Sequence, residues 1–304
     1  MQTTLMRSAG FSGVGLHSGK PVRMTVAPAA PDHGIVFQRS DLPVHDSRIR
    51  VCPQNWEAAA LCTVLRNDAG AHVSTIEHVM AALAGCGIHN ALVRLDGAEV
   101  PILDGSAAPF VAGIVDAGLK VQGAPLRVLR VLQPVEVRDG RASARLEPAL
   151  HPEIRFEIDF PDAAIGHQSR RILLQGDAFV RDLADSRTFC RSADVDAMRR
   201  NGLALGGSLD NAVVVDGASV LTPGGLRHAD EPVRHKMLDA LGDLAVAGHP
   251  FVGRYVGRRA GHALTGALLQ KLLGDPAAFR VERCDARTRG RLPNAGAEVL
   301  ALSA

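Results

Sequence analysis

The chain has 304 residues, of which 46% are hydrophobic and 22% charged, a composition typical of one large or two ordinary globular domains, which excludes a disordered chain. Its apolar runs are much shorter than the ~20 residues of a membrane-spanning helix, and no signal-peptide pattern opens it, so we expect a cytoplasmic protein. The 34 basic and 32 acidic residues are scattered along the chain and leave a net charge of +2, which argues against a nucleic-acid partner.

The first half of the chain predicts a sheet followed by a helix–strand–helix unit. Ser74-Thr75-Ile76-Glu77 is a capping box that predicts a helix start, and apolar residues at helical spacing continue this helix to Gly85. A strand closed by Asp96-Gly97 comes next, and a second helix is expected over residues 106–117. Strands are expected at residues 22–27, 34–38, 60–65 and 90–95.

The same order of elements recurs in the second half. A helix is expected to begin at Glu231-Pro232, because Pro is favoured at the first helical position, and to end at Gly248. A strand at 251–256 and a helix from His262 to Leu273 follow. The two helices of a unit start 31 residues apart in the first half (75 to 106) and 30 apart in the second (232 to 262), which predicts a duplication. The strands expected before the second unit lie at residues 127–131, 135–138, 142–146, 154–160 and 212–215.

The duplication predicts an α+β protein of two similar domains, residues 1–122 and 126–278, joined by a short polar stretch. The second domain is longer, and its surplus is an Ala/Leu/Gly-rich insertion at about 190–220 that is long enough to cover a ligand. Residues 279–304 are Arg-rich and then small and apolar, with little periodicity, so we expect a loose C-terminal tail.

Three polar residues share one stripe of the second-half helix. His235, Asp239 and Asp243 follow one another at i, i+4 and i+8, on the side opposite to the apolar residues. A histidine and a carboxylate one turn apart on one face can bind the same cation. The alternative is a solvated polar face, which is the more frequent origin of an isolated H-x-x-x-D spacing.

Glu77 and His78 open the helix that the duplication makes equivalent. Each of the two has a simple structural interpretation. Glu77 would be the capping partner of Ser74, and His78 would be a surface residue of the first turn. With His235 and Asp239, however, His78 completes a set of two histidines and one aspartate, which leaves a fourth position open on zinc, as in catalytic sites. The neighbouring glutamate would then accept a proton from water at that site. The two histidines lie 157 residues apart, so spacing alone does not show that the helices meet.

His262 begins the last helix of the second unit. The positive end of a helix disfavours imidazolium, so a catalytic acid there would need a carboxylate nearby, and Asp243 is the natural candidate. The alternative is that His262 only caps the helix. Lys236, Arg258 and Arg259 flank the same elements and suit an anionic group such as phosphate, although solubility is the ordinary role of surface arginines.

Seven blocks of the sequence together resemble a known family. They are GFSGVGLHSG at 10–19, STIEH at 74–78, PILDGS at 101–106, SRTF at 186–189, GGSLDN at 206–211, EPVRHKMLD at 231–239 and GH at 261–262. These blocks are similar to the zinc-dependent UDP-3-O-acyl-N-acetylglucosamine deacetylases, which carry out the committed step of lipid A biosynthesis in Gram-negative bacteria. They run in order along nearly the whole folded chain, and the match is highly specific.

The resemblance implies a fold of two similar domains, each a β-sheet layered with helices, packed helix to helix as a β-α-α-β sandwich. In that fold the equivalent helices face each other, so that Glu77-His78 and the second-half ligands would converge at the interface. The resemblance further implies that His78, His235 and Asp239 bind one catalytic Zn²⁺ and that Glu77 is the general base.

The remaining catalytic roles are also implied by the resemblance. His262, held by Asp243, would be the general acid that protonates the glucosamine nitrogen, and Thr188 would stabilise the oxyanion. The products would be UDP-3-O-acyl-glucosamine and acetate.

The insertion at about 190–220 corresponds to the family's hydrophobic passage for the acyl chain. The implied substrate contacts are Lys236, Phe189 beside the sugar, Phe160 near the nucleotide, Arg259 for the diphosphate, Gly261, Leu16, and Cys62, which would suit an inhibitory second zinc.

Two other functions remain open from the sequence. One is a zinc amidohydrolase for a different N-acetyl sugar or acyl amide, and the other is a catalytically silent module that binds a nucleotide or lipid. The apolar insertion and the Arg258-Arg259 pair favour a substrate with a fatty chain and a diphosphate, and the intact ligand set disfavours a silent module. We expect a monomer whose partner is the UDP-linked acylated amino sugar, with transient contacts to membrane-associated pathway enzymes or to a protease that recognises the apolar ending 299–304.

Overall fold

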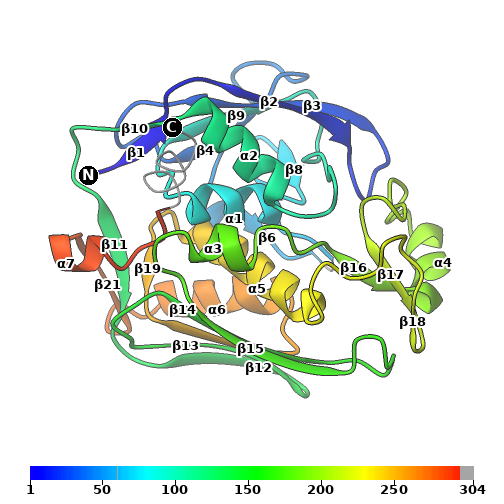
Figure 1. Ribbon diagram of the computed structural model, residues 1–304. Helices are drawn as coiled ribbons and strands as arrows, with labels where there is room; N and C mark the ends of the chain where they lie inside the picture. Colours follow the sequence, from blue (N-terminus) through cyan, green and yellow to red (C-terminus); the bar gives the residue numbers. More distant parts are fainter. Residues whose placement is uncertain (60, 295–304) are drawn as a thin grey trace.

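The computed structural model describes residues 1–59 and 61–294. Two sheets lie on the outside of the molecule, and helices fill the space between them (Figure 1). This arrangement confirms the predicted α+β fold and its β-α-α-β layering. The helices between the two sheets are α1 (Glu77–Gly85), α2 (Ala108–Ala117), α5 (Glu231–Leu244) and α6 (His262–Leu273).

Each half of the chain builds a five-stranded sheet, and the two sheets have the same topology. The strand orders are β2-β3-β9-β4-β5 and β12-β13-β20-β14-β15. In both sheets the central strand is parallel to one neighbour and antiparallel to the other, and it follows α1 in the first half and α5 in the second. This shared order supports the predicted duplication. The strands are β2 (Ala9–Val14), β3 (Pro21–Pro28), β4 (Ile35–Arg39), β5 (Arg48–Arg50), β9 (Ala91–Leu95), β12 (Val135–Asp139), β13 (Ala142–Glu147), β14 (Glu153–Asp159), β15 (His167–Leu173) and β20 (Arg254–Arg258).

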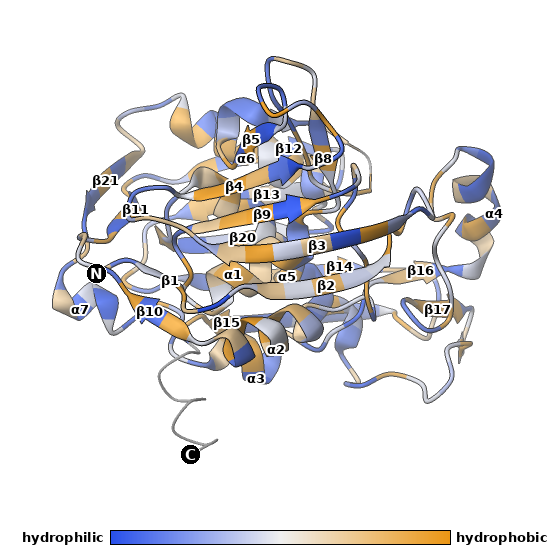
Figure 2. Ribbon diagram, turned by 90° about the horizontal axis from the view of Figure 1, so that it is seen from above, coloured by the Kyte–Doolittle hydropathy of each residue, from blue (hydrophilic) through white to orange (hydrophobic). Residues whose placement is uncertain are grey.

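The sequence of a sheet strand explains which face it buries. Along β3, Val22, Met24 and Val26 are buried, whereas Arg23 between them is exposed. This alternation is expected of an antiparallel strand with one face on a core and one in solvent. Figure 2 shows the resulting mixture of hydrophobic and hydrophilic residues along β3.

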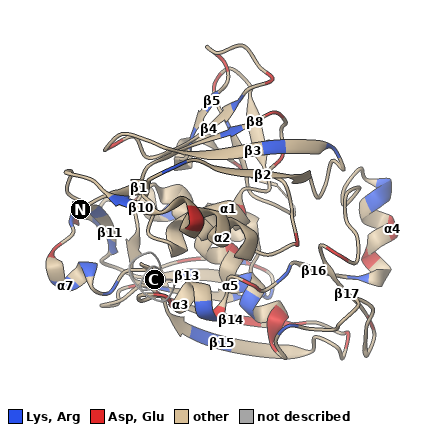
Figure 3. Ribbon diagram, turned by 45° about the horizontal axis from the view of Figure 1, so that its top comes forward, with Lys and Arg blue, Asp and Glu red and all other residues tan. Residues whose placement is uncertain are grey.

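Smaller sheets and short helices surround this sandwich. Helix α4 projects at one end of the molecule beside β16 and β17, and it carries both basic and acidic residues (Figures 1 and 3). The remaining strands are β1 (Thr3–Leu5), β6 (Trp56–Glu57), β7 (Val64–Arg66), β8 (His72–Ser74), β10 (Leu119–Val121), β11 (Arg127–Val131), β16 (Phe189–Arg191), β17 (Val213–Asp216), β18 (Ser219–Val220), β19 (Phe251–Val252) and β21 (Phe279–Arg283). The remaining helices are α3 (Ala178–Asp182), α4 (Ser192–Arg200), α7 (Ala286–Arg289) and the 3₁₀ helices η1 (Pro53–Asn55) and η2 (Ala245–Ala247).

Two local predictions are wrong for clear physical reasons. The capping box is not formed, because Ser74 ends strand β8, and α1 begins only at Glu77 without a side-chain cap. The strand expected at 251–256 is broken at Gly253, where a Cβ atom would lie 2.7 Å from Cγ2 of Val131. Only glycine fits that close approach between neighbouring strands.

The expected loose tail is also corrected. Residues 279–283 form β21, which pairs antiparallel with all five residues of β11, and α7 follows with its cap at Asp285. Ladder hydrogen bonds therefore hold a segment whose sequence shows little periodicity. Residues 295–304, including the apolar ending, lie outside the described part of the chain.

One hydrophobic core extends across the helices of both halves. Val79, Met80 and Leu83 of α1 are at most 1% exposed, as are Met237 and Leu238 of α5. The helix layer is thus buried on both sides, which gives the molecule a shared interior. Among the described residues, no helix combines the length and the hydrophobicity that a bilayer crossing requires.

Candidate active site

Helices α1 and α5 approach each other closely where the two halves meet. Gly242 of α5 lies against the backbone of Glu77, the first residue of α1, and a Cβ atom at Gly242 would lie 2.0 Å from the Glu77 carbonyl oxygen. Glycine is therefore required here by space. This contact places the first turn of α1 beside the last turn of α5.

Two histidines and an aspartate converge at this contact. The residues are His78, His235 and Asp239, and all three are buried. Each offers one donor atom, a ring nitrogen or a carboxylate oxygen, and these three atoms lie within 4.8 Å of one another. The Nε2 atoms of His78 and His235 are 3.6 Å and 3.3 Å from Oδ1 of Asp239. The structure therefore supplies the contact between the two halves that spacing alone does not show.

The state of these donor atoms fits a divalent cation. Within the described residues, Oδ1 of Asp239 is buried and accepts no hydrogen bond, an arrangement that is costly for a carboxylate unless a cation is bound. His235 donates its Nδ1 proton to the carbonyl of Ser186 at 3.0 Å, which leaves the Nε2 lone pair facing Asp239. Burial lowers the pKa of His235 to about 4, so the ring is neutral at pH 7. Two imidazoles and one carboxylate are a donor set that zinc prefers.

His262 lies on the other side of the same cluster. Its Nδ1 is 3.0 Å from Oδ2 of Asp243. Its Nε2 is 3.9 Å from Oε1 of Glu77 and 3.9 Å from Oδ2 of Asp239. Burial would lower the pKa of His262, but the Asp243 and Glu77 carboxylates outweigh it and raise the pKa to about 9. His262 is therefore an imidazolium at neutral pH, and its Nε2 proton points toward the cluster. The predicted partnership with Asp243 is present in the structure.

Glu77 is buried and faces His262. Burial raises the pKa of Glu77, which brings a carboxylate closer to the basicity that a general base needs. Its Oε2 accepts the backbone N–H of Thr63 at 3.0 Å, while the Thr63 hydroxyl donates to Oδ1 of Asp243. Thr63 thus bridges the two carboxylates. Sequence reasoning missed it, because a lone threonine ahead of a short strand shows no period or motif.

Comparison with known proteins identifies the family. The family model described as UDP-3-O-acyl N-acetylglycosamine deacetylase matches residues 2–274. The chain belongs to this family. It is 51% identical over 280 residues to the UDP-3-O-acyl-N-acetylglucosamine deacetylase of Phenylobacterium zucineum, covering 92% of this chain and 96% of that protein. The protein of the same name from Anaeromyxobacter dehalogenans is 50% identical, over 93% of this chain and 90% of that protein. The one from Shewanella baltica is 43% identical, over 92% of this chain and 92% of that protein. The resemblance inferred from the seven sequence blocks is confirmed.

Of the two phenylalanines that the deacetylase resemblance singles out, Phe189 lies beside the cluster and Phe160 packs against Phe189. The ring of Phe189 is 6.3 Å from the His235 ring and 5.4 Å from the Phe160 ring, in edge-to-face geometry in both cases. Thr188, next to Phe189, donates its backbone N–H to the carbonyl of Gly105 at 2.8 Å. The PILDGS block of the first half therefore meets the SRTF block of the second.

Lys236 and Cys62 also border the deacetylase-family cluster. The Lys236 ammonium is 2.7 Å from Oδ2 of Asp239. Lys236 therefore pairs with Oδ2, whereas Oδ1 accepts no hydrogen bond from the described residues. Burial would lower the pKa of Lys236, but Asp239 outweighs it and the pKa is raised. Burial and the Glu77 carboxylate raise the pKa of the Cys62 thiol to about 12, so it stays protonated at pH 7.

The other positions expected from the deacetylase resemblance lie further out. The Leu16 carbonyl accepts the N–H of Gly206 at 3.0 Å, which joins the first-half loop to the insertion of the second half. Gly261 is the N-cap residue of α6, directly before His262. Arg259 instead pairs with Asp159, so its side chain is held at the sheet rather than at the cluster.

We expect Gly242→Ala to lower both stability and metal affinity. The added methyl group collides with backbone, so α1 and α5 must separate, and overpacking of this kind costs about 1–3 kcal/mol. Urea unfolding and zinc titration would measure the two effects. Gly123→Ala is the matched control, because no atom lies within 4 Å of a Cβ there. An unchanged Gly242→Ala protein would contradict the role of this contact.

Proposed function

We propose that this chain is a zinc-dependent deacetylase that hydrolyses the N-acetyl group of UDP-3-O-(3-hydroxyacyl)-N-acetylglucosamine, the committed step of lipid A biosynthesis. The observation that carries the proposal is the buried cluster of His78, His235 and Asp239, flanked by Glu77 and His262. The substrate class comes from the family and from the names of its relatives. The products would be acetate and UDP-3-O-acyl-glucosamine.

His78, His235 and Asp239 would hold the zinc ion. Bound there, zinc would act as a Lewis acid that polarises the acetamide carbonyl and lowers the pKa of water. Two observations support this assignment: Oδ1 of Asp239 accepts no hydrogen bond from the described residues, and the Nε2 atoms of both histidines face it. Lys236 would keep the second oxygen of Asp239 occupied and contribute positive charge toward an anionic substrate.

Glu77 and His262 would move the two protons of the reaction. Glu77 accepts a proton from the water molecule that attacks the acetamide carbon, with its other oxygen held by the Thr63 N–H. His262 donates its Nε2 proton to the glucosamine nitrogen as the C–N bond breaks, so that the sugar leaves as an amine. Asp243 holds the Nδ1 side of the ring and keeps the imidazolium charged.

The surrounding residues would bind and orient the substrate. Thr188 would donate its hydroxyl to the developing oxyanion. Phe189 offers an apolar face beside His235 for the sugar, and Phe160 extends that face toward the nucleotide. Cys62 would serve a second, inhibitory zinc ion, at the cost of its thiol proton. The remaining proposed contacts are Leu16, Gly261, Arg259 for the diphosphate, and the insertion at about 190–220 for the acyl chain.

The first test is acetate release from UDP-3-O-(3-hydroxyacyl)-N-acetylglucosamine by protein of known metal content. We expect a chelator to remove the activity and about one equivalent of zinc to restore it, because three ligands form a single site. Bound zinc without acetate release would point to a different acetamido sugar. Full activity in metal-free protein would refute the zinc assignment.

Replacing the proposed base should lower turnover but not substrate binding. Glu77→Gln preserves shape and removes the proton acceptor, so we expect kcat to fall by about 10²–10⁴ with KM nearly unchanged. Glu57→Gln is a suitable control, because Glu57 is exposed and pairs with Arg66. Equal losses in both variants would show that the effect does not come from proton transfer.

The pH–rate profile should be bell-shaped. Activity rises as Glu77 loses its proton and falls as the pH rises through the His262 pKa of about 9, where the imidazolium is lost. Asp243→Asn removes the charge that raises this pKa, so we expect the basic limb to move down by about one unit or more. A basic limb that stays in place in this variant would exclude His262 as its origin.

A further inference from the structure

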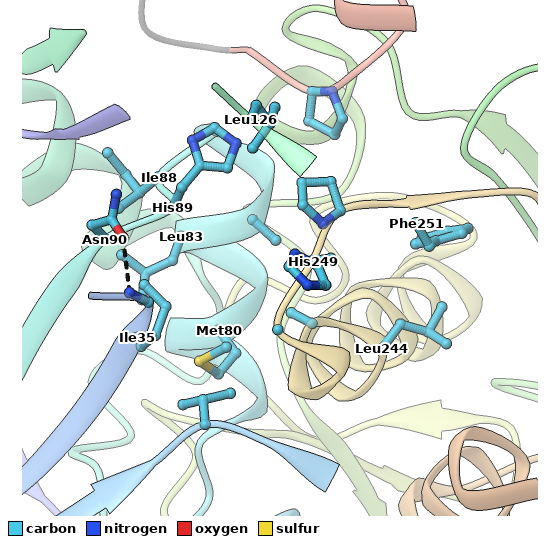
Figure 4. Close-up of a pocket in the computed structure, with 18 of the residues that line it drawn as sticks. Ile35, Met80, Leu83, Ile88, His89, Asn90, Leu126, Leu244, His249 and Phe251 are labelled. Carbon is cyan, nitrogen blue, oxygen red and sulfur yellow. Dashed lines mark hydrogen bonds between the residues drawn. The ribbon is translucent and has the colours of Figure 1, made fainter. Parts of the chain in front are cut away.

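A cavity of about 330 Å³ lies between the two halves, away from the deacetylation cluster (Figure 4). Its walls include Met80 and Leu83 of α1 and Leu244 at the end of α5, together with Ile88 and Phe251 from the loop and strand that follow these helices. None of the proposed catalytic or metal-binding side chains lines it. Its volume and apolar walls are those of a small-molecule site.

The duplication places equivalent turns on both sides of this cavity. In the first half Gly87, with φ of 71°, ends the helix region and leads through His89 to β9. In the second half Gly248, with φ of 76°, leads through His249 to β19. Each half therefore contributes one histidine to the wall of the cavity, and both histidines are labelled in Figure 4.

His89 is a neutral hydrogen-bond donor in this wall. Its Nδ1 accepts the N–H of Thr3 at 3.0 Å, so the proton of the neutral ring is on Nε2. Burial lowers the pKa of His89 to about 3, which keeps the ring neutral. The nearby Asn90 is already satisfied, because it accepts from Gly34 and donates to the side chains of Gln2 and Gln122.

The charged residues that line the cavity give it a positive balance. Arg50 and Arg127 are exposed, and neither forms an ion pair within residues 1–59 and 61–294. The one acidic residue of the lining, Asp32, accepts a hydrogen bond of 2.6 Å from the Gln2 amide. Arg50 donates only to the carbonyl of His33, at 3.4 Å, among the described residues. An apolar interior with two guanidinium groups that no carboxylate neutralises there is complementary to an aliphatic chain with a single anionic head.

We propose that this cavity is a second ligand site, which binds a medium-chain carboxylate between the two halves of the molecule. The carboxylate would lie toward Arg50 and Arg127, and the aliphatic chain would lie along α1. From Met80 to Gly85, the last residue of α1, the helix rises by roughly 7.5 Å, which suits the seven-carbon tail of an eight-carbon carboxylate. The cavity lies at the C-terminal ends of α1 and α5, whereas the insertion expected to hold the substrate's acyl chain lies beside α4 at the edge of the molecule (Figure 1).

Isothermal titration of the full chain with octanoate tests the proposal. We expect one equivalent to bind, hexanoate to bind about fifteenfold more weakly because it lacks two methylenes that contribute about fourfold each, and acetate not to bind. Neutral 1-octanol should bind about fivefold or more weakly than octanoate, because it lacks the charge that faces the arginines. Since no turnover is measured, failure of the deacetylase assay would not affect this result.

Matched variants locate the site. Ala245→Leu fills the cavity and should abolish octanoate binding, whereas Ala247→Leu, two residues along η2 and outside the lining, should not. Arg50→Ala changes an exposed side chain without endangering the fold and should weaken octanoate, but not 1-octanol, by about fivefold. Arg48→Ala on the same strand is its control, because Arg48 does not line the cavity.

Two outcomes would overturn the proposal. The first is equal octanoate binding within each matched pair, that is, in Ala245→Leu and Ala247→Leu, and in Arg50→Ala and Arg48→Ala. That result would place the ligand elsewhere, for example where the substrate's acyl chain binds. Binding that appears only after Leu300→Asp and Leu302→Asp would mean that the chain's own apolar ending competes for the cavity and that no free carboxylate is its natural occupant.

Discussion

The contact between Gly242 and the backbone of Glu77 is the constraint on which the rest of the structure depends. It sets the distance between α1 and α5, and the proposed ligand set is divided between these helices, with His78 on one and His235 and Asp239 on the other. Neither half has the cluster alone. The two outer sheets, the shared core and the loops around the site all hold this one helix pair in place.

Around this contact the protein buries an unusual concentration of charge. Asp239, Asp243 and Glu77 are buried, and the cations that pair with them within the described residues are the half-buried Lys236 and the His262 imidazolium. Burial of an excess carboxylate disfavours the folded state, and it raises the pKa of Glu77 accordingly. A divalent cation bound at the cluster would turn this net negative charge into a net positive charge. The excess of buried negative charge therefore favours the binding of a divalent cation, and it keeps His262 protonated.

The sequence predicted the fold well where periodicity and duplication agree. The i, i+4, i+8 stripe of α5 and the equivalent start of α1 identified the right helices, and the two sheets share one strand order. The meeting of those helices came only from the family resemblance, because no local pattern encodes a contact over 157 residues. Thr63 was missed since its role exists only in three dimensions. The capping box predicted at Ser74 is not formed, because Ser74 ends β8 and the Glu77 carboxylate accepts the backbone N–H of Thr63.

The division of the site between the halves also determines when it can form. Thr63 and Asp243 are 180 residues apart, and Thr63 and His262 are 199 apart. Contacts of such long range require large loops to close and slow the folding of a chain. During synthesis the first half emerges before α5, so Met80 and Leu83 lack the second-half residues Leu241 and Leu244 that line the cavity with them in the folded protein. Until the ribosome has passed α6, the nascent protein exposes an apolar helix face and is open to aggregation, so assembly of the two halves is the step at which this chain most needs protection.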